Sequence, residues 1–199
     1  NKYGAVLIFD EIRTAFRLRI GGAQELYGVL PDLAVVGKAM ANGYAIAAVT
    51  GRAEIMKVIA EGKVFISSTY FGNSDGYVAA LKTIEIIQRE NVIQNLWDKG
   101  TRFLEKLRNI ISKYNVGAEL SGVAPMYFIT FKRDKAGVFR QRRTEFYTQL
   151  IRRGVFLAPY HHGYICYRQT DEDLDMAAKA IDEALAYVNE KYGDFKEEE

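Results

Sequence analysis

The chain has 199 residues and a net charge of +2, with 27 Lys and Arg against 25 Asp and Glu. Hydrophobic residues make up 49% and charged residues 26%, which is typical of a folded globular chain and excludes global disorder. The near-neutral charge gives no electrostatic reason to expect nucleic acid or an anionic membrane as a partner. No apolar run approaches the roughly 20 residues needed to cross a bilayer, so we expect no membrane association.

Cysteine and histidine usage narrows the site chemistry further. The single cysteine, Cys166, excludes an internal disulfide and a zinc site of several cysteines, and we interpret it as a small buried hydrophobic residue. The two histidines, His161 and His162, are too few for most metal sites, so we predict no metal. Such sparse cysteine usage is typical of a reducing compartment, and we expect a cytoplasmic protein. The chain begins at Asn1, almost directly on an apolar run, and we interpret it as a fragment of a longer protein.

The first part of the chain has the pattern of an α/β domain. Residues 4–9 are continuously apolar and stop at Asp10-Glu11, which is typical of a strand buried on both faces of a parallel sheet. Further strands are predicted over residues 32–36 and 45–50, and a helix over 52–61. A loop follows, and then a long helix from about residue 74 to 111 with a bend near 91–95.

The second part alternates strands and helices at short intervals. Strands are predicted over residues 126–131, 155–158 and 164–167. One helix, 143–153, ends at Gly154, and the last begins at Thr170, a good N-cap, and continues to about 192. We therefore predict a large domain with its long connecting helix over residues 1–111 and a small C-terminal α+β domain over residues 112–199.

Three polar residues follow the apolar segments of the first domain: Asp10, Lys38 and Thr69. In open α/β sheets, ligands bind at the carboxyl ends of the strands. Taken singly, each residue has an ordinary structural explanation: a turn carboxylate, a solvated lysine and a capping hydroxyl. A carboxylate and a lysine at the same sheet edge suit a ligand that is both electrophilic and cationic.

Several motifs occur together in a distinctive order. They are LIFDEIRTAFR over residues 7–17, then Gly21-Gly22-Ala23, Pro31-Asp32-Leu33, Gly37-Lys38 and STYFGN over residues 68–73, with a TDED helix start near the C-terminus. In order, spacing and type the chain resembles the class III (subgroup II) pyridoxal-phosphate aminotransferases, and within them the glutamate-1-semialdehyde aminomutase-like branch. The resemblance covers nearly the whole chain, most firmly residues 5–85. It implies the second half of a type I pyridoxal-phosphate (PLP) transferase large domain, mostly a parallel sheet, followed by a small C-terminal α+β domain.

The resemblance also implies roles for individual residues. Lys38 would form the Schiff base with pyridoxal 5′-phosphate and act as the general acid and base. Asp10 would pair with the pyridine nitrogen, and Ile12 would pack on one face of the ring. Thr69, assisted by Ser68, would bind the phosphate of a neighbouring subunit's cofactor, which implies a homodimer.

Two departures from the family pattern affect the expected activity. The family's proline after Gly-Asn is Ser74, and His162 takes the place of the aminomutase glutamate. The second change favours transamination between a small-molecule amino donor and a carbonyl acceptor. Arg168 is a candidate for binding a substrate carboxylate, because guanidinium groups bind carboxylates bidentately. The family's first half, which holds the main phosphate-binding turn and the ring-stacking aromatic residue, has no counterpart here, so the 199-residue chain alone is predicted to be inactive.

Three alternatives stay open at this point. One is glutamate-1-semialdehyde 2,1-aminomutase, and another is a non-catalytic fragment or assembly domain. The third is the Walker B half of a P-loop ATPase, because residues 6–11 read as a Walker B strand. No G-x-x-x-x-G-K-[ST] motif occurs in the chain, which disfavours the ATPase.

Overall fold

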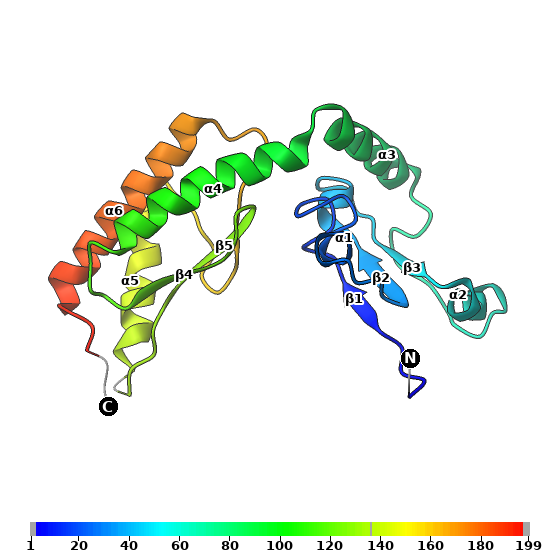
Figure 1. Ribbon diagram of the computed structural model, residues 1–199, viewed down its shortest axis with the longest axis horizontal. Helices are drawn as coiled ribbons and strands as arrows, with labels where there is room; N and C mark the ends of the chain where they lie inside the picture. The colour runs from blue at the N-terminus through cyan, green and yellow to red at the C-terminus, as the bar shows by residue number, and fades with distance from the viewer. Residues whose placement is uncertain (1–2, 136, 197–199) are drawn as a thin grey trace. The chain divides into compact units, whose positions relative to one another are not determined.

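The computed structural model describes residues 3–135 and 137–196 (Figure 1). The chain forms two compact units, residues 1–94 and 95–199, and each is described by itself. The long helix predicted over residues 74–111 consists of two helices, 74–89 and 92–111. The first lies in the first unit, and most of the second lies in the second unit. The domain boundary at residues 111 and 112 stays a prediction for the whole protein.

A three-stranded sheet organises the first unit. Its strands, in spatial order, are β1 (Ile8–Asp10), β2 (Leu33–Val36) and β3 (Ala48–Gly51). β1 and β2 are parallel, with Asp10 opposite Val35, as expected for a sheet of this class. β3 joins β2 antiparallel, so the sheet is mixed within this unit.

Four helical segments accompany this sheet: α1 (Ala23–Tyr27), the 3₁₀ turn η1 (Lys38–Met40), α2 (Ala53–Ala60) and α3 (Ser74–Arg89). The N-cap of α3 is Asn73, whose side chain accepts a hydrogen bond from the Asp75 amide at 3.1 Å. The helix predicted over residues 74–111 is interrupted at Asn91, which has a left-handed backbone with φ of 49°. The interruption lies at the start of the predicted bend.

The core of the first unit is small. Met40, Ala41 and Ala80 are buried, and partly buried apolar residues pack against them. The expectation that residues 4–9 form a strand buried on both faces is wrong for this chain, because Leu7 and Ile8 are exposed. β1 is also an edge strand of this sheet, so that among the described residues only one of its two hydrogen-bonding edges is paired, with β2.

The second unit combines an antiparallel sheet with three helices. Its strands are β4 (Ala118–Val123), β5 (Met126–Phe131) and β6 (Gly163–Tyr164), in that spatial order. Its helices are α4 (Val92–Ile111), α5 (Val138–Arg152) and α6 (Asp171–Tyr192). β4 is not among the strands predicted from the sequence, and the strand predicted over residues 155–158 is irregular backbone.

The apolar faces of these elements form the main core of the chain. β5 alternates strictly, with Tyr127, Ile129 and Phe131 buried. The fully buried side chains that the three helices contribute include Leu107, Phe146, Leu150, Ile181 and Leu185. Burying each such side chain stabilises the fold by about 1.5–3 kcal/mol.

Local hydrogen bonds determine where the helices begin. α5 begins five residues before the predicted start, because the Asp134 carboxylate accepts hydrogen bonds from the Val138 and Phe139 amides at 2.8 and 2.7 Å. Thr170 is the N-cap of α6, as predicted, and Thr170 and Asp173 form a reciprocal capping box.

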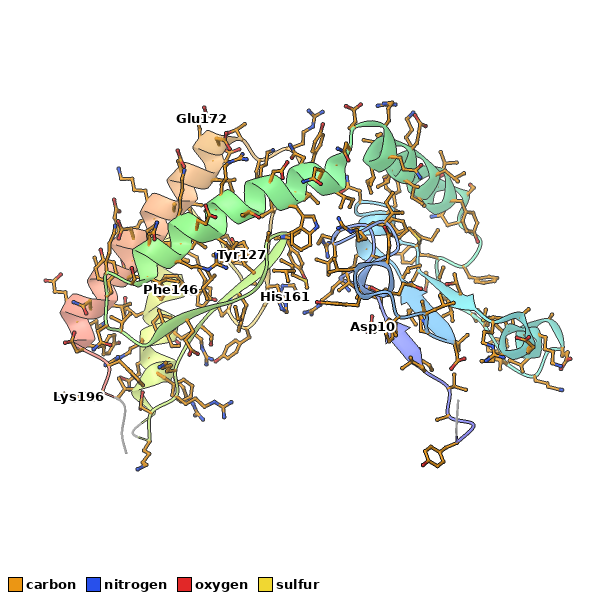
Figure 2. The ribbon with its side chains drawn as sticks, viewed as in Figure 1. Asp10, Tyr127, Phe146, His161, Glu172 and Lys196 are labelled. Carbon is orange, nitrogen blue, oxygen red and sulfur yellow. The ribbon has the colours of Figure 1, made fainter. Side chains whose placement is uncertain are left out.

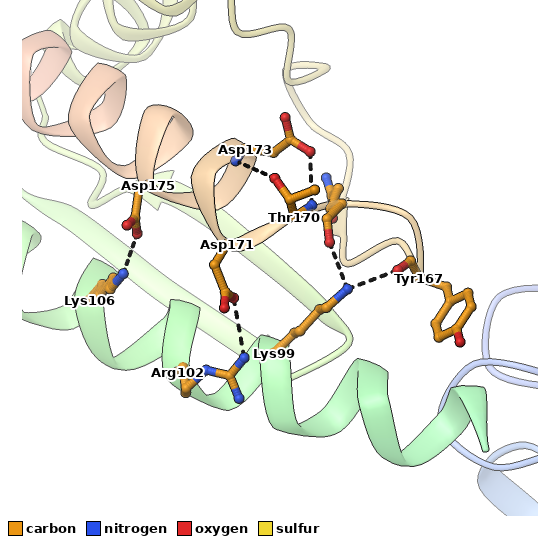
Figure 3. A network of polar contacts seen from close by, with 9 residues as sticks. Lys99, Arg102, Lys106, Tyr167, Thr170, Asp171, Asp173 and Asp175 are labelled. Carbon is orange, nitrogen blue, oxygen red and sulfur yellow. Dashed lines mark hydrogen bonds and ion pairs between the residues drawn. The ribbon is translucent and has the colours of Figure 1, made fainter. Parts of the chain in front are cut away.

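Charged residues join α4 to α6 along their exposed sides (Figure 3). Arg102 pairs with Asp171 at 3.3 Å, and Lys106 pairs with Asp175. One further pair, between Lys113 in the turn after α4 and Asp182, continues the series at 2.7 Å. The two helices therefore run in the same direction. Within the described residues, none of the helices combines the length and apolar character that crossing a membrane requires.

Candidate active site

Two consecutive carboxylates at the end of β1 have different environments. Asp10 is exposed, whereas Glu11 is buried. Glu11 accepts hydrogen bonds from the Ala23 and Gln24 amides, both at 2.8 Å, and from the Thr14 hydroxyl. Glu11 thus binds the amino end of α1 and fixes the turn that follows β1. This role of Glu11 was not predicted from the sequence, although the Gly21-Gly22 pair downstream indicates a close backbone approach at this turn.

Asp10, which is labelled in Figure 2, is the exposed carboxylate of the two and can contact a ligand. Its Oδ1 accepts a hydrogen bond from the Ile12 amide at 3.1 Å, which orients the carboxylate. A pocket of about 320 Å³ adjoins it, lined by Asp10, Glu11 and neighbouring residues of β1 and α1. The backbone turns at residues 12–14, so strand alternation does not determine the side on which Ile12 lies. The predicted packing of Ile12 on a cofactor ring stays a prediction.

Lys38 is separated from the end of β2 by Gly37 and has an unusual backbone conformation. Its φ is 46°, in the left-handed region that non-glycine residues rarely adopt. The turn is closed by the Ala41 amide, which donates to the Lys38 carbonyl at 3.3 Å. Met40 and Ala41, immediately after it, are buried and anchor the turn, while the Lys38 side chain is exposed. Backbone strain of this kind is often found at functional sites.

The pairing of β1 with β2 brings Asp10 and Lys38 to one edge of the sheet. The strands are parallel, and the Glu11 amide continues the ladder by donating to the Val35 carbonyl at 2.9 Å. Carboxyl ends of parallel strands meet at the same edge. Lys38 does not line the pocket beside Asp10, so that pocket alone is not the predicted site.

An ion pair between a buried carboxylate and an exposed guanidinium lies at the amino ends of β1 and β2. Asp32 accepts from the Leu7 amide at 2.8 Å and pairs with Arg52 at 3.0 Å. The Leu7 hydrogen bond, followed by the Arg52 guanidinium, holds the pKa of Asp32 below its ordinary value. The start of β1, the start of β2 and the N-cap of α2 are thereby joined through one carboxylate.

The residues predicted to bind phosphate lie in the loop before α3. Ser68 and Thr69 are exposed, and the Phe71 amide donates to the Ser68 carbonyl at 3.1 Å, which forms a tight turn. Hydroxyl groups are suitable donors to a phosphate, and an amine and a carboxylate suit an aldehyde and a pyridine nitrogen. The donor set in this unit therefore fits the chemistry of PLP, with Lys38 and Asp10 grouped at one sheet edge.

The two residues predicted to bind substrate belong to the second unit. The His162 ring lies 5.7 Å from the Phe128 ring, and the His162 carbonyl lies 3.0 Å from the His161 Nδ1 atom. Arg168 is exposed in the loop that precedes α6. Lys99 fixes this loop by donating to the carbonyls on either side of Arg168, at 2.8 and 2.6 Å (Figure 3).

Two further observations concern the metal and cysteine predictions. In residues 3–135 and 137–196, no group of three or more His, Cys, Asp or Glu side chains is placed to hold a metal ion. Cys166 is exposed, so its interpretation as a buried hydrophobic residue is wrong. The Cys166 amide donates to the Gln169 side chain at 2.7 Å, which keeps this residue in the loop before α6 instead of in the core.

Similarity to curated proteins extends over most of the chain. The chain is 55% identical over 188 residues to the 3-aminobutyryl-CoA aminotransferase of Cloacimonas acidaminovorans, and the match covers 94% of this chain and 45% of that relative. It is 34% identical over 185 residues to the glutamate-1-semialdehyde 2,1-aminomutase of Persephonella marina, covering 88% of this chain and 43% of the relative. The chain thus spans less than half the length of these curated relatives.

Solved structures show the same fold. A transaminase with PLP bound superposes with a TM-score of 0.85 at 23% identity, covering 94% of this chain and 45% of that one. An omega-transaminase from Sphaerobacter thermophilus gives a TM-score of 0.82 at 23% identity, with the same coverages. The chain therefore has the α/β fold of the corresponding part of these transaminases.

The family described as aminotransferase class-III matches residues 1–185. This match excludes the P-loop ATPase alternative, because residues 6–11 lie within the part of the chain that matches the aminotransferase family. The chain belongs to the class III aminotransferase family.

Proposed function

We propose that the full-length protein containing this chain is a PLP-dependent aminotransferase that acts on a 3-aminoacyl-CoA thioester as amino donor and on a carbonyl acceptor. The observation that carries this proposal is the 55% identity, over 94% of the chain, to an enzyme named for 3-aminobutyryl-CoA. The aminomutases reach 32–35% identity over similar lengths. His162, where the aminomutase branch has a glutamate, also favours transamination.

In this proposal Lys38 and Asp10 act on the two reactive ends of the cofactor. Lys38 would hold the cofactor covalently through its amine and, once the substrate amine has displaced it, the freed amine would move a proton at the substrate carbon. Asp10 pairs with the pyridine nitrogen, and the hydrogen bond from the Ile12 amide holds the Asp10 carboxylate in place. PLP, when bound, supplies the electron sink for the reaction. Ser68 and Thr69 bind phosphate, and His162 and Arg168 contact substrate.

The assembly and location of the protein are part of the same proposal. We infer a cytoplasmic homodimer in which Thr69 serves the neighbouring subunit's cofactor. Tyr70 and Phe71, which follow Thr69, are exposed in the single chain, and burial against a second copy would remove this apolar surface from water. Sedimentation of the full-length protein as a stable monomer would contradict this inference.

The proposed activity is tested with purified full-length protein loaded with PLP. We expect it to convert 3-aminobutyryl-CoA with a 2-oxo acid as acceptor, and not to isomerise glutamate-1-semialdehyde. Isomerisation without amino transfer would replace the proposal by the aminomutase alternative. The 199-residue chain alone is expected to show no transaminase activity, and turnover by it would contradict that prediction.

A further inference from the structure

The turn after β5 and the first half of α5 are strongly basic. Residues 132–143 contain six Lys or Arg and a single acidic residue, Asp134. The Asp134 carboxylate already accepts hydrogen bonds from the Val138 and Phe139 amides. The amino end of α5 is therefore satisfied by the chain itself, and any anion recognised here would be bound by side chains.

The arginines of this segment divide into two groups. Arg142 is buried, and it donates to the Val116 carbonyl at 3.1 Å and the Asp194 carbonyl at 3.3 Å. Arg140 is exposed and Arg143 is half-buried. Both guanidinium groups lie 5.7 Å from the centre of the Phe139 ring.

An exposed tyrosine completes the cluster. The Arg143 guanidinium lies over the Tyr160 ring, 3.7 Å from its centre, and also donates to the Tyr160 hydroxyl. The Tyr160 side chain is 70% exposed, and its φ is 64°, in the left-handed region. Among the residues that the structure describes, the contacts of Arg140 and Arg143 are with these aromatic groups, and none is an ion pair with a carboxylate. We call Phe139, Arg140, Arg143 and Tyr160 the α5 arginine patch.

We infer that the α5 arginine patch binds the nucleotide end of an acyl-CoA substrate; this inference rests on the proposed function. That end carries a diphosphate and a 3′-phosphate, which alone bears about 1.5–2 negative charges at neutral pH. A planar guanidinium group donates two parallel hydrogen bonds to phosphate oxygens. Because Arg140 and Arg143 have no carboxylate partner among the described residues, their N–H groups are available for such bonds. The exposed ring of Tyr160 offers a surface on which the adenine base stacks.

The position of the patch in the chain agrees with this role. Tyr160 directly precedes His161 and His162, and His162 is the residue predicted to contact the substrate. The Arg143–Tyr160 contact therefore connects α5 to the beginning of the loop that contains His162. A thioester bound at that loop would extend its nucleotide end to the neighbouring arginines.

Binding is tested on the full-length protein with adenosine 3′,5′-bisphosphate as probe, measured by titration calorimetry. The double variant Arg140→Gln/Arg143→Gln is expected to weaken binding by about tenfold or more, since charge-assisted hydrogen bonds to phosphate are lost. The control Arg152→Gln/Lys179→Gln removes the same charge from exposed positions at the far end of α5 and on α6. It is expected to change binding by less than about twofold, because distant surface charges are screened by salt. Equal losses in both variants, or no loss in the first, would overturn the inference.

A second comparison isolates the role of Tyr160. Tyr160→Leu keeps an apolar side chain at this backbone position but removes the ring. We expect weaker binding of adenosine 3′,5′-bisphosphate and unchanged binding of inorganic diphosphate. Equal weakening of both probes would remove adenine stacking from the inference.

Kinetics separate this inference from the proposed function. In the wild-type protein, 3-aminobutyryl-CoA is expected to have a lower KM than 3-aminobutyryl-pantetheine, which lacks the nucleotide. The double arginine variant should lose this preference by raising only the KM of the CoA thioester. If both thioesters react but the preference survives in the variant, the patch is wrong and the function stands. If neither thioester reacts while the bisphosphate result holds, the function is wrong and the binding site stands.

Discussion

The carboxylate of Glu11 occupies the space that Gly22 leaves open by lacking a side chain. A Cβ atom on Gly22 would lie 2.6 Å from the Glu11 carboxylate carbon. Gly22 also has a φ of 81°, which L side chains rarely adopt. The buried carboxylate that fixes the turn after Asp10 thus depends on a glycine eleven positions along the chain.

Gly22→Ala should therefore destabilise the protein more than Gly28→Ala. Both glycines have positive φ, but a Cβ on Gly28 would meet nothing within 4 Å. The Gly22 variant carries an added steric cost of about 1–3 kcal/mol, typical of overpacking. Urea denaturation of the full-length protein measures the two free energies of unfolding, and equal losses would show that backbone strain alone matters.

Lys38→Ala should abolish covalent attachment of the cofactor and lower transamination by several orders of magnitude, because the nucleophilic amine and the proton carrier are lost together. Borohydride reduction followed by peptide mapping of the wild-type protein should place the label on Lys38. Lys57→Ala, which removes another exposed lysine of the first unit, serves as the control and should retain the label. A label on any other lysine would exclude the proposed site.

Asp10→Asn should keep the cofactor bound but lose most of the rate. The neutral amide no longer favours a protonated pyridine nitrogen, whereas the attachment through Lys38 is untouched. Absorbance of the bound cofactor and steady-state rates distinguish the two effects. Asp75→Asn removes an exposed carboxylate elsewhere in the same unit and should leave both unchanged.

Acid should weaken the first unit through Asp32. Its pKa in the folded chain is lower than the ordinary 3.8, so its contribution is complete above that pH and is lost as the pH falls through the lowered value. The Asp32→Asn variant should be less stable near neutral pH, and its deficit should shrink below pH 3.8. Glu54, which also contacts Arg52 but is exposed, provides the control as Glu54→Gln. A deficit that is independent of pH would contradict the assigned ionisation.

Alkali should weaken the second unit through Tyr147. Burial raises the pKa of Tyr147 from 10.0 to about 12, so its contribution is present below pH 10.0 and is lost as the pH rises through about 12. The hydroxyl donates to the Ile129 carbonyl at 2.8 Å, so Tyr147→Phe should cost about 0.5–1.5 kcal/mol below pH 10.0. This cost should shrink between pH 10.0 and about 12, as followed by denaturation at each pH. A constant cost would contradict the prediction.

Strong local signals in the sequence predicted most of the helices. Thr170 with its acidic first turn and Gly154 at the end of α5 correspond to a capping box and to a glycine with φ of 79°. β4 was missed because Glu119, Ser121 and Gly122 interrupt its apolar pattern, and it is defined mainly by pairing with β5. The segment over residues 155–158 is apolar but pairs with no strand. Strand pairing is a tertiary property that a local pattern does not contain.

The candidate site was predicted through its motif more than through its local physics. Asp10 and Glu11 are the same kind of residue in sequence, and only the fold shows that one is exposed and the other binds the start of α1. Lys38 reads as an ordinary solvated lysine, yet its backbone is left-handed. The roles of Lys38, Asp10, Ile12, Ser68 and Thr69 stay predictions that the variants above test.

The ion pairs between the α4 segment and α6 determine how the two helices are aligned along their lengths. Arg102, Lys106 and Lys113 each pair with an aspartate 69 positions later, so one offset satisfies all three. Exposed pairs of this kind contribute only about 0.2–1 kcal/mol each. A displacement of α4 by one helical turn would bring Lys106 to Asp171 but would place Ile110 at Asp175 and Lys113 at Ala178. The uneven spacing of the cations therefore favours the observed alignment of the two helices over a displacement by one turn.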